Sequence, residues 1–242
     1  MDNYLCSPLH SAAGFAQAML SGLSGELPDK QKKYLEIINS NTSELLLFIQ
    51  NLISLSKAES DIYKFEYSSF DITMLLSEVL NEFGVKLQNR DVKLTAEASN
   101  LQTNACWSDK NAVKNIIANL LEAACGLVET GAVHISLSNP EPELLLSKGI
   151  IVNSNPAKKS YIICEISAKG ADAGFFAGED IFDPYKQADK NSKKYLLHSL
   201  LLGSAKLFLE KLKGGIWASS NSANQLSLIF ALPAGKSEAE AV

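Results

Sequence analysis

Apolar side chains in the N-terminal part of the chain recur at steps of four and three positions. This spacing places them on one face of a helix and predicts a helix over residues 4–23. Glycines near residue 25 end this helix, and the same pattern returns from Tyr34 to Glu59. We expect Asp29 to cap the second helix. The segment 1–61 is therefore predicted to be a helical hairpin.

The apolar stripe of the second predicted helix is wider than one antiparallel neighbour can cover. Leu35, Leu46 and Ile49 lie beside the main stripe and widen it. Two hairpins that bury their shared apolar faces form a four-helix bundle. We therefore expect the protein to be a homodimer.

Beyond residue 61 short alternating segments are mixed with helical ones. Alternation predicts strands at 65–67, 92–98, 132–137, 161–166, 215–219 and 225–232. Helical spacing predicts helices at 72–83, 110–127 and 195–212. Segments in this order form two layers, with helices on one side of a sheet. We expect an α+β fold in which a two-layer α/β sandwich spans 62–235, with an insert at about 139–160 and a tail at 236–242.

The charge balance argues against nucleic acid as a partner. The 242 residues carry 22 Lys plus Arg against 27 Asp plus Glu, for a net charge of −5, and Arg90 is the single arginine. A nucleic-acid groove needs clustered cations. No apolar run reaches the roughly 18–20 residues that span a bilayer, and the first residues do not have the pattern of a signal peptide. We expect no membrane span and a cytoplasmic location.

The four cysteines show no pattern typical of a metal or redox site. Cys6, Cys106, Cys125 and Cys164 form no CxxC pair and lie in apolar stretches, so we interpret them as packing residues. No spacing of His, Asp and Glu predicts a metal site, and no Ser/His/Asp or Cys/His arrangement predicts a hydrolase.

Five short motifs occur in a fixed order along the chain. The hairpin begins with LCSPL at 5–9, and its second helix ends in LSKAE at 55–59. NLL at 119–121, IFDPY at 181–185 and KGGIW at 213–217 follow. Together they resemble the cytoplasmic core of sensor histidine kinases. The resemblance implies a dimerisation and phosphotransfer hairpin followed by a Bergerat-type ATP-binding domain.

The resemblance also assigns the positions at which the family carries its chemistry. The phosphoacceptor histidine falls on Asn3, and the acidic residue beside it falls on Tyr4. A carboxamide nitrogen has a delocalised lone pair and cannot attack a γ-phosphate as an imidazole nitrogen does. We therefore expect no catalytic residue here. His10, about two helical turns further along, is the alternative acceptor.

The nucleotide-binding positions depart from the family pattern as well. The vestigial positions that keep a family residue are Asn119, Gly170 and Gly203. Ala123 replaces a metal-binding asparagine, Gly126 a lysine and Ala168 the adenine-binding aspartate. A hydrogen bond to a buried polar group is worth about 1–3 kcal/mol, and about 1.4 kcal/mol is tenfold in affinity. We therefore expect no binding of ATP or magnesium and no autokinase activity.

The favoured hypothesis is a catalytically inactive, histidine-kinase-like protein that binds a response-regulator receiver domain or a related kinase in two-component signalling. The family's docking surface for receivers lies near the phosphoacceptor, and here it comprises Tyr4, Ser7, His10, Ser11 and Gly14. Two alternatives stay open. One is a histidine phosphotransferase that relays phosphate through His10, and the other is a pocket that binds a ligand other than ATP.

Two further features are interpreted without a functional role. His134 and His198 are expected to be structural or solvated, and the leucines between 196 and 202 are expected to pack onto the sheet.

Overall fold

The computed structural model describes residues 2–23, 25–60, 63–87, 91–98, 101–140, 161–171, 181–183, 193–221 and 225–235. Most of the expected insert and all of the expected tail lie outside these ranges. The chain divides into two compact units, Met1–Ile62 and Tyr63–Val242, which are described separately.

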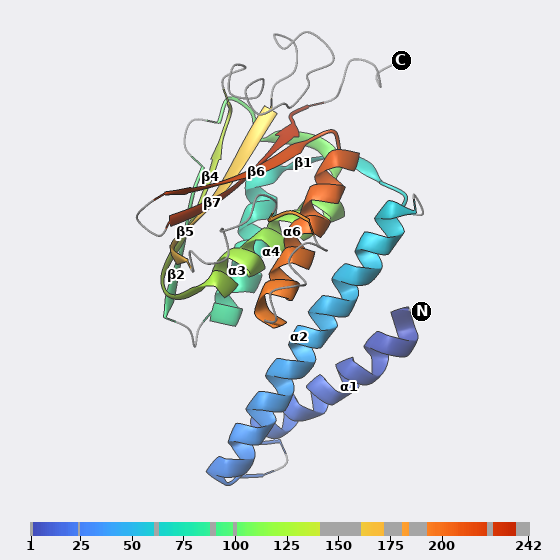
Figure 1. Ribbon diagram of the computed structural model, residues 1–242, viewed down its shortest axis with the longest axis vertical. Helices are drawn as coiled ribbons and strands as arrows, with labels where there is room; N and C mark the ends of the chain where they lie inside the picture. The colour runs from blue at the N-terminus through green and yellow to red at the C-terminus, as the bar shows by residue number, and fades with distance from the viewer. Residues whose placement is uncertain are drawn as a thin grey trace. The chain divides into compact units, whose positions relative to one another are not determined.

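The first unit is a hairpin of two helices, α1 (Asp2–Leu20) and α2 (Asp29–Glu59) (Figure 1). α1 ends three residues before the predicted position because a Schellman motif closes it. Gly22 has a φ of 82°, its N–H donates to the Met19 carbonyl, and the Leu23 N–H donates to the Ala18 carbonyl. The left-handed conformation at Gly22 is the one that glycine adopts without strain.

The start of α2 corrects the expected cap. Pro28 is the N-cap residue and makes no side-chain capping bond, whereas Asp29 is the first residue of the helix. The carboxylate of Asp29 therefore acts only through its charge, which is favourable near the positive end of the helix dipole.

The hairpin leaves much of its apolar surface uncovered within one chain. Ala16 on α1 and Leu46 on α2 are buried. The exposed large apolar side chains are Tyr4, Leu5, Phe15, Met19, Leu23, Tyr34, Ile37, Ile38, Leu45 and Leu52. Exposed apolar area on this scale is typical of a surface that associates with another protein.

The described residues of the second unit form a five-stranded sheet, a two-stranded sheet and three long helices. Its elements in chain order are β1 (Tyr67–Asp71), α3 (Ile72–Leu87), β2 (Val92–Glu97), β3 (Ala105–Asp109), α4 (Lys110–Leu127), β4 (Val128–Ser138), β5 (Tyr161–Ala171), α6 (Lys193–Lys211), β6 (Gly215–Asn221) and β7 (Gln225–Pro233). The large sheet has the order β2-β4-β5-β7-β6, with β2 parallel to β4 and the other pairs antiparallel.

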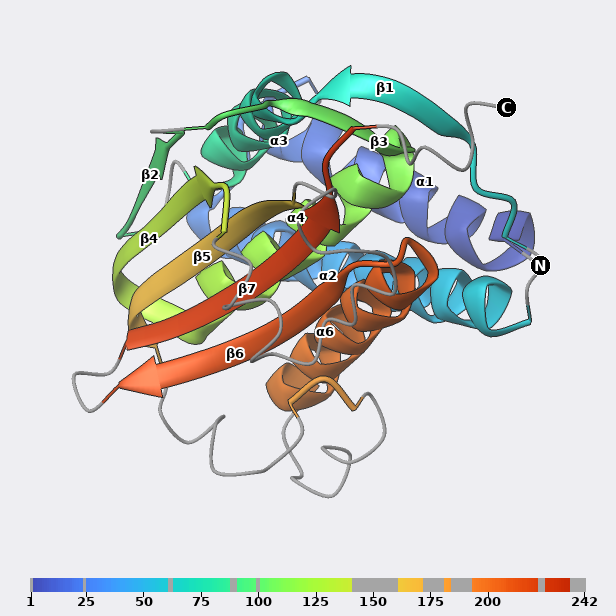
Figure 2. The ribbon, with the colours of Figure 1, turned by 90° about the horizontal axis from the view of Figure 1, so that it is seen from above.

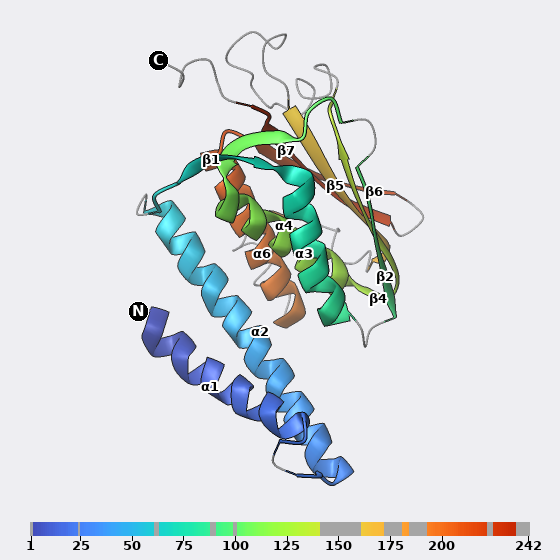
Figure 3. The same cartoon turned by 180° about the vertical axis from the view of Figure 1, so that it is seen from behind.

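The helices α3, α4 and α6 cover one face of the large sheet (Figures 2 and 3). Alternate strand residues such as Val133, Ile135 and Leu137 point to this face and are buried. Ile116 and Leu120 of α4, in the helical layer, are also buried. The predicted two-layer α+β fold is confirmed.

The two-stranded sheet differs most from the sequence prediction. The strand predicted at 65–67 is instead β1, which pairs antiparallel with β3, an element that was not predicted. The alternation at 65–67 has another cause, because the Phe65 ring packs against the rings of Phe208 and Tyr67 with centroids 6.1 and 6.5 Å away. Ring packing and strand pairing thus produce the same short pattern.

One buried carboxylate connects these elements. Asp109, which is 3% exposed, caps α4 by accepting a hydrogen bond from the Ala112 N–H at 2.9 Å. Its second oxygen accepts from the Glu66 N–H at 2.9 Å. Asp109 therefore fixes the start of α4 and the segment that leads into β1.

Candidate functional site

The residues expected to form a docking surface lie together on α1. Tyr4, Ser7, Ser11 and Gly14 follow each other at steps of three and four, which places them on one helical face. All of them are exposed, as is His10, and Tyr4 is 89% exposed. The Ser11 hydroxyl donates to the Ser7 carbonyl at 3.1 Å. Asn3 lies in the first turn of α1, and its side chain lies outside the described part of the structure.

The positions expected at a nucleotide site lie on α4, β5 and α6 of the second unit. On α4, Asn119, Ala123 and Gly126 share one face because they are four and three residues apart. Asn119 and Ala123 are buried. A methyl group at 123 offers no ligand to a metal ion, which requires oxygen donors if it is magnesium.

The imidazole of His198 lies directly against Gly126. His198 is on α6, which packs on α4, and it is 4% exposed. A Cβ atom at position 126 would overlap His198 Nε2 and would lie 3.1 Å from Cε1. The ring therefore fills the place that a side chain at 126 would occupy. Of the two expectations for His198, the structural one is confirmed and the solvated one is wrong.

Gly203, one of the vestigial nucleotide-binding positions, and the three leucines before it lie inside a helix. Leu200, Leu201, Leu202 and Gly203 are interior residues of α6, which begins at Lys193. All are buried, whereas Leu196 is exposed. Within an α-helix each interior N–H donates to the carbonyl four residues earlier. These amides are therefore not available in the way that the first amides of a helix are for binding phosphate.

Gly170 has a structural reason to be glycine. Its φ is 87°, and a Cβ there would lie 2.8 Å from the Thr130 carbonyl oxygen. Across the strand pair, Gly131 has a φ of 153°, and a Cβ there would overlap the Lys169 carbonyl oxygen. The β4–β5 register shifts between Val128 and Ala132. Both glycines thus allow the backbone conformation and the close approach of the strands at this irregularity in the sheet.

Ala168, at the position that the resemblance assigns to the adenine-binding aspartate, is surrounded by other residues of the sheet. Ala168 is fully buried on the helical face of β5, paired with Val133 of β4 and Leu226 of β7. An apolar methyl group cannot accept a hydrogen bond from an adenine amino group.

The KGGIW motif ends α6 and begins β6. Lys213 has a φ of 58°, its N–H donates to Glu210, and the Gly214 N–H donates to Leu209 at 2.8 Å, which is a second Schellman motif. A Cβ at Gly214 would lie 2.5 Å from the Ala231 carbonyl oxygen. In the IFDPY motif, Ile181 is buried, and residues 184–185 lie outside the described ranges.

The remaining titratable residues take structural roles. Burial raises the pKa of the Cys106 thiol to about 12 and also raises the pKa of Cys164, where the charge of Glu165 adds to the effect. Cys106, Cys125 and Cys164 are buried and belong to no disulfide. On the surface of the sheet, His134 Nδ1 lies 3.0 Å from the Thr95 hydroxyl.

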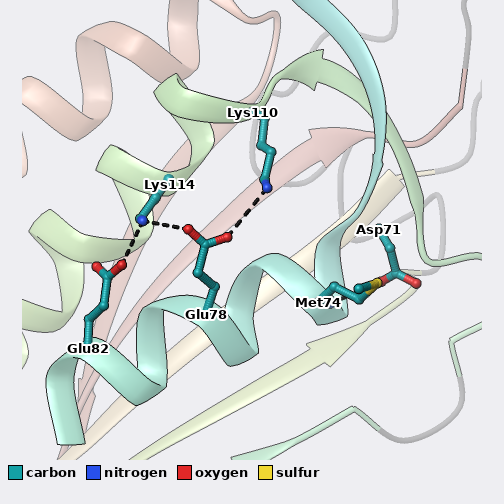
Figure 4. A network of polar contacts seen from close by, with 6 residues as sticks. All are labelled: Asp71, Met74, Glu78, Glu82, Lys110 and Lys114. Atoms are coloured by element: carbon teal, nitrogen blue, oxygen red, sulfur yellow. Dashed lines mark hydrogen bonds and ion pairs between the residues drawn. The ribbon is translucent and has the colours of Figure 1, made fainter. Parts of the chain in front are cut away.

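An ion-pair network joins the outer surfaces of α3 and α4 (Figure 4). Lys114 Nζ lies 2.7 Å from Glu78 and 2.8 Å from Glu82, and Lys110 Nζ lies 3.4 Å from Glu78. The hydrogen bonds from Lys114 and then Lys110 lower the pKa of Glu78. At the start of α3, Asp71 Oδ1 accepts from the N–H and hydroxyl of Thr73, and these bonds lower the pKa of Asp71.

Within the ranges that the structure describes, no group of three His, Cys, Asp or Glu residues has the arrangement of a metal site. Among the same residues, no helix combines the length and apolarity required to cross a bilayer.

Comparison with known proteins gives these features a family context. Residues 6–61 match the family model of the His Kinase A (phospho-acceptor) domain. The circadian input-output histidine kinase CikA of Thermosynechococcus vestitus is 30% identical over 51% of this chain and 17% of its own length. Histidine protein kinase DivJ of Caulobacter vibrioides is 26% identical over 54% of this chain and 22% of its own. The chain spans less than a quarter of the length of such relatives.

Solved structures extend the likeness over both units. The histidine kinase AdeS of Acinetobacter baumannii has a TM-score of 0.58 at 19% identity, covering 97% of this chain and 98% of that one. ShkA, solved in complex with AMPPNP, has a TM-score of 0.66 at 15% identity, covering 98% of this chain and 45% of that one. Together with the match to the phospho-acceptor domain, these findings show that the chain has a sensor histidine kinase core.

Proposed function

We propose that this protein acts in two-component signalling by binding and not by catalysis. In this proposal it is a cytoplasmic homodimer that has the fold of a histidine kinase, performs no autophosphorylation, and docks the receiver domain of a response regulator or a related kinase. The observation that carries the proposal is the packing of the buried His198 ring of α6 against Gly126, the position at which the resemblance expects a nucleotide-binding lysine.

The phosphoacceptor position supports the loss of autokinase activity. Asn3 stands there in α1, and a carboxamide cannot take the place of an imidazole as nucleophile. Tyr4 stands where the neighbouring acidic residue would assist proton removal, and its phenol offers no carboxylate to accept the proton.

The nucleotide position supports the loss of ATP and magnesium. Phosphoryl transfer depends almost entirely on positioning and on neutralising charge with metal and amide groups. Ala123 supplies no metal ligand, Ala168 supplies no adenine acceptor, and the amides near Gly203 lie within α6. Each missing hydrogen bond costs about 1–3 kcal/mol, so the combined loss places nucleotide affinity far below that of a working kinase.

The first unit supports a role in binding. It contains the match to the phospho-acceptor domain, exposes a wide apolar stripe and presents the α1 surface around Tyr4 and His10. The histidine kinase ThkA, solved in complex with the response regulator protein TrrA, shares the fold with a TM-score of 0.58 at 18% identity, covering 95% of this chain and 60% of that one.

Two measurements test the loss of activity. We expect no heat of binding when Mg-ATP is titrated into the protein, and no radiolabel on the chain after incubation with γ-labelled ATP. The variant Asn3→His is the matched control, because it restores the acceptor without changing the nucleotide position. It also should remain unlabelled. Tight Mg-ATP binding by the unaltered protein, or label on it, would contradict the proposal.

Binding is tested with purified receiver domains. We expect Tyr4→Ala, on the docking surface, to weaken binding of a receiver that the unaltered protein captures. Met74→Ala is the matched control, since Met74 is an exposed apolar residue on α3 of the second unit and does not belong to the docking surface on α1. Equal binding by the two variants would place the docking surface elsewhere.

The exposure of His10 supports one alternative, a phosphotransferase. His10 lies on α1 seven residues after Asn3, which is about two helical turns, and its side chain is accessible. Incubation with a phosphorylated receiver would place acid-labile phosphate on the unaltered protein and none on His10→Gln. Absence of label on both proteins excludes this alternative.

A further inference from the structure

One polar residue interrupts the apolar stripe of α2. The stripe follows steps of four and three residues along the helix, and its apolar members are Tyr34, Ile38, Leu45, Phe48 and Leu52. Asn41 occupies the position between Ile38 and Leu45, because it lies three residues after the first and four before the second. The stripe therefore carries a carboxamide near its middle.

Asn41 lies on the open side of α2. Its side chain is exposed, and of the apolar residues on either side of it Ile38 is 48% exposed and Leu45 is 46% exposed. Thr42, the next residue, is instead buried, and its hydroxyl donates to the Ile38 carbonyl at 2.7 Å. Asn41 and Thr42 thus lie on different sides of the helix, and Asn41 shares its side with the exposed apolar residues.

Other amide side chains of α2 have partners within the chain. Asn39 donates to the Gln17 carboxamide at 3.1 Å, and Asn51 donates to the Leu47 carbonyl at 2.9 Å. Among the residues that the structure describes, the Asn41 side chain has no such partner. In water it needs none. If the stripe were buried, however, the carboxamide would lose its hydrogen bonds to water and would require a polar partner in their place.

The association that buries this stripe is the homodimer of the proposed function, and the inference made here rests on it. A two-fold symmetric interface brings the same surface of both copies together, so that surface must be complementary to itself. The stripe meets this condition for charge, because no Lys, Arg, Asp or Glu stands at its positions. A second copy of the chain therefore meets no like charge along it.

Two orientations of the α2 helices bury the stripe, and they differ in what Asn41 meets. In a parallel dimer in register, each residue lies at the height of its own counterpart, so Asn41 lies level with Asn41 of the second copy. In an antiparallel dimer centred on the stripe, Tyr34 lies level with Leu52, and Asn41 lies level with Leu45. Only the parallel orientation supplies the carboxamide with a polar partner.

We propose that Asn41 sets the orientation of the homodimer. The two Asn41 carboxamides form one polar layer in a bundle core that is otherwise apolar along this stripe. A single buried asparagine in a helical bundle specifies register at a cost in stability. Here the layer makes the dimer weaker than an all-apolar core would, and it excludes the antiparallel orientation, in which both carboxamides are buried against aliphatic side chains.

Cysteine cross-linking distinguishes the two orientations. In a Cys6→Ser background the three remaining cysteines are buried, so a short bismaleimide reacts at an introduced cysteine. Tyr34→Cys should cross-link to itself, because parallel helices bring the two copies of position 34 together. In an antiparallel dimer these positions are 18 residues, or about 27 Å, apart along the bundle. Tyr34→Cys would then cross-link to Leu52→Cys when the two proteins are mixed.

The variant Asn41→Leu tests the role of the carboxamide. It should stay dimeric at lower protein concentration than the unaltered stripe. Mixtures of its Tyr34→Cys and Leu52→Cys forms should also give the 34–52 product, which the chain with Asn41 does not give. Ser40→Leu is the matched control, since Ser40 is exposed on the same helix but off the stripe, and it should give the 34–34 product alone.

The outcomes separate this inference from the proposed function. A 34–34 product alone from Asn41→Leu, or a 34–52 product from the chain with Asn41, overturns the role of Asn41 and leaves the homodimer in place. A monomeric mass for the unaltered protein by light scattering contradicts the homodimer, and the role of Asn41 falls with it.

Discussion

The His198 ring and Gly126 are in direct contact, so no larger residue fits at position 126 unless the ring moves. α4 and α6 carry these two residues, and their packing joins the helical layer over the sheet. The contact puts an aromatic side chain where the family resemblance expects a lysine. It therefore links the packing of the domain to the loss of nucleotide chemistry that we propose.

Gly126→Ala should destabilise the protein, although alanine is the better helix former. The added methyl group overlaps His198 Nε2, and forcing a buried ring to move costs about 1–3 kcal/mol. Gly84→Ala is the matched control, because Gly84 lies within α3 with no atom within 4 Å of the added Cβ. It should gain up to about 1 kcal/mol.

Urea unfolding measures the stability of both glycine variants. A double variant tests whether the conflict with the His198 ring causes the loss. Gly126→Ala combined with His198→Ala should lose less stability than the sum of the two single changes, since each change relieves the conflict that the other meets. Additive losses would show that the ring and the glycine do not interact.

Asp109→Ala should be among the most damaging single changes in the second unit. It removes the α4 cap, worth about 1–2 kcal/mol, and the hydrogen bond from the Glu66 N–H, worth about 0.5–1.5 kcal/mol. Thermal or urea unfolding measures the loss. Asp29→Ala is the control, because Asp29 makes no capping bond, and should change stability by less than about 0.5 kcal/mol.

The Glu78 network should make stability depend on pH and salt. The folded state lowers the pKa of Glu78 below its ordinary value of 4.5, so the contribution of this group is fully present above pH 4.5 and is lost as pH falls through the lowered pKa. Glu78→Gln should therefore be less stable than the unaltered protein at pH 7 and approach it at acid pH. A difference independent of pH and of added sodium chloride would contradict this account.

Leu45→Asp should convert a dimer to a monomer. Leu45 belongs to the exposed apolar stripe of α2, and a carboxylate there would have to be buried without a partner in a four-helix bundle. Size-exclusion chromatography with light scattering gives the mass. Ser40→Asp, exposed on the same helix but off the stripe, should remain dimeric. A monomeric mass for the unaltered protein would refute the expected dimer itself.

The sequence alone predicted the long helices, and α4 most accurately. α4 has its predicted bounds, 110–127, since the apolar period runs without interruption over these residues. β3 was missed because five residues between a polar loop and a helix leave too short a pattern. The end of α1 was misplaced because Leu23 continues the apolar period while Gly22 has already ended the helix.

The sequence assigned residues to the expected site but gave none of their contacts. The motif register identified Asn3, Ala123, Gly126 and Ala168, because these positions are counted from nearby anchors in the chain. The contact between His198 and Gly126 depends on how α6 packs on α4, and residues 72 positions apart leave no local signal of it. The one indication of this contact in the sequence was a glycine, Gly126, in the interior of a helix and on its buried side.

Gly131 and Gly170 face each other across β4 and β5, each with a backbone oxygen of the opposite strand in the way of a side chain. Replacement of a ligand such as the adenine-binding aspartate creates no such steric conflict with the backbone. A glycine of a nucleotide-binding motif can therefore be retained after nucleotide binding is lost. Its presence in a divergent homologue then reflects the geometry of a strand pair more than a retained activity.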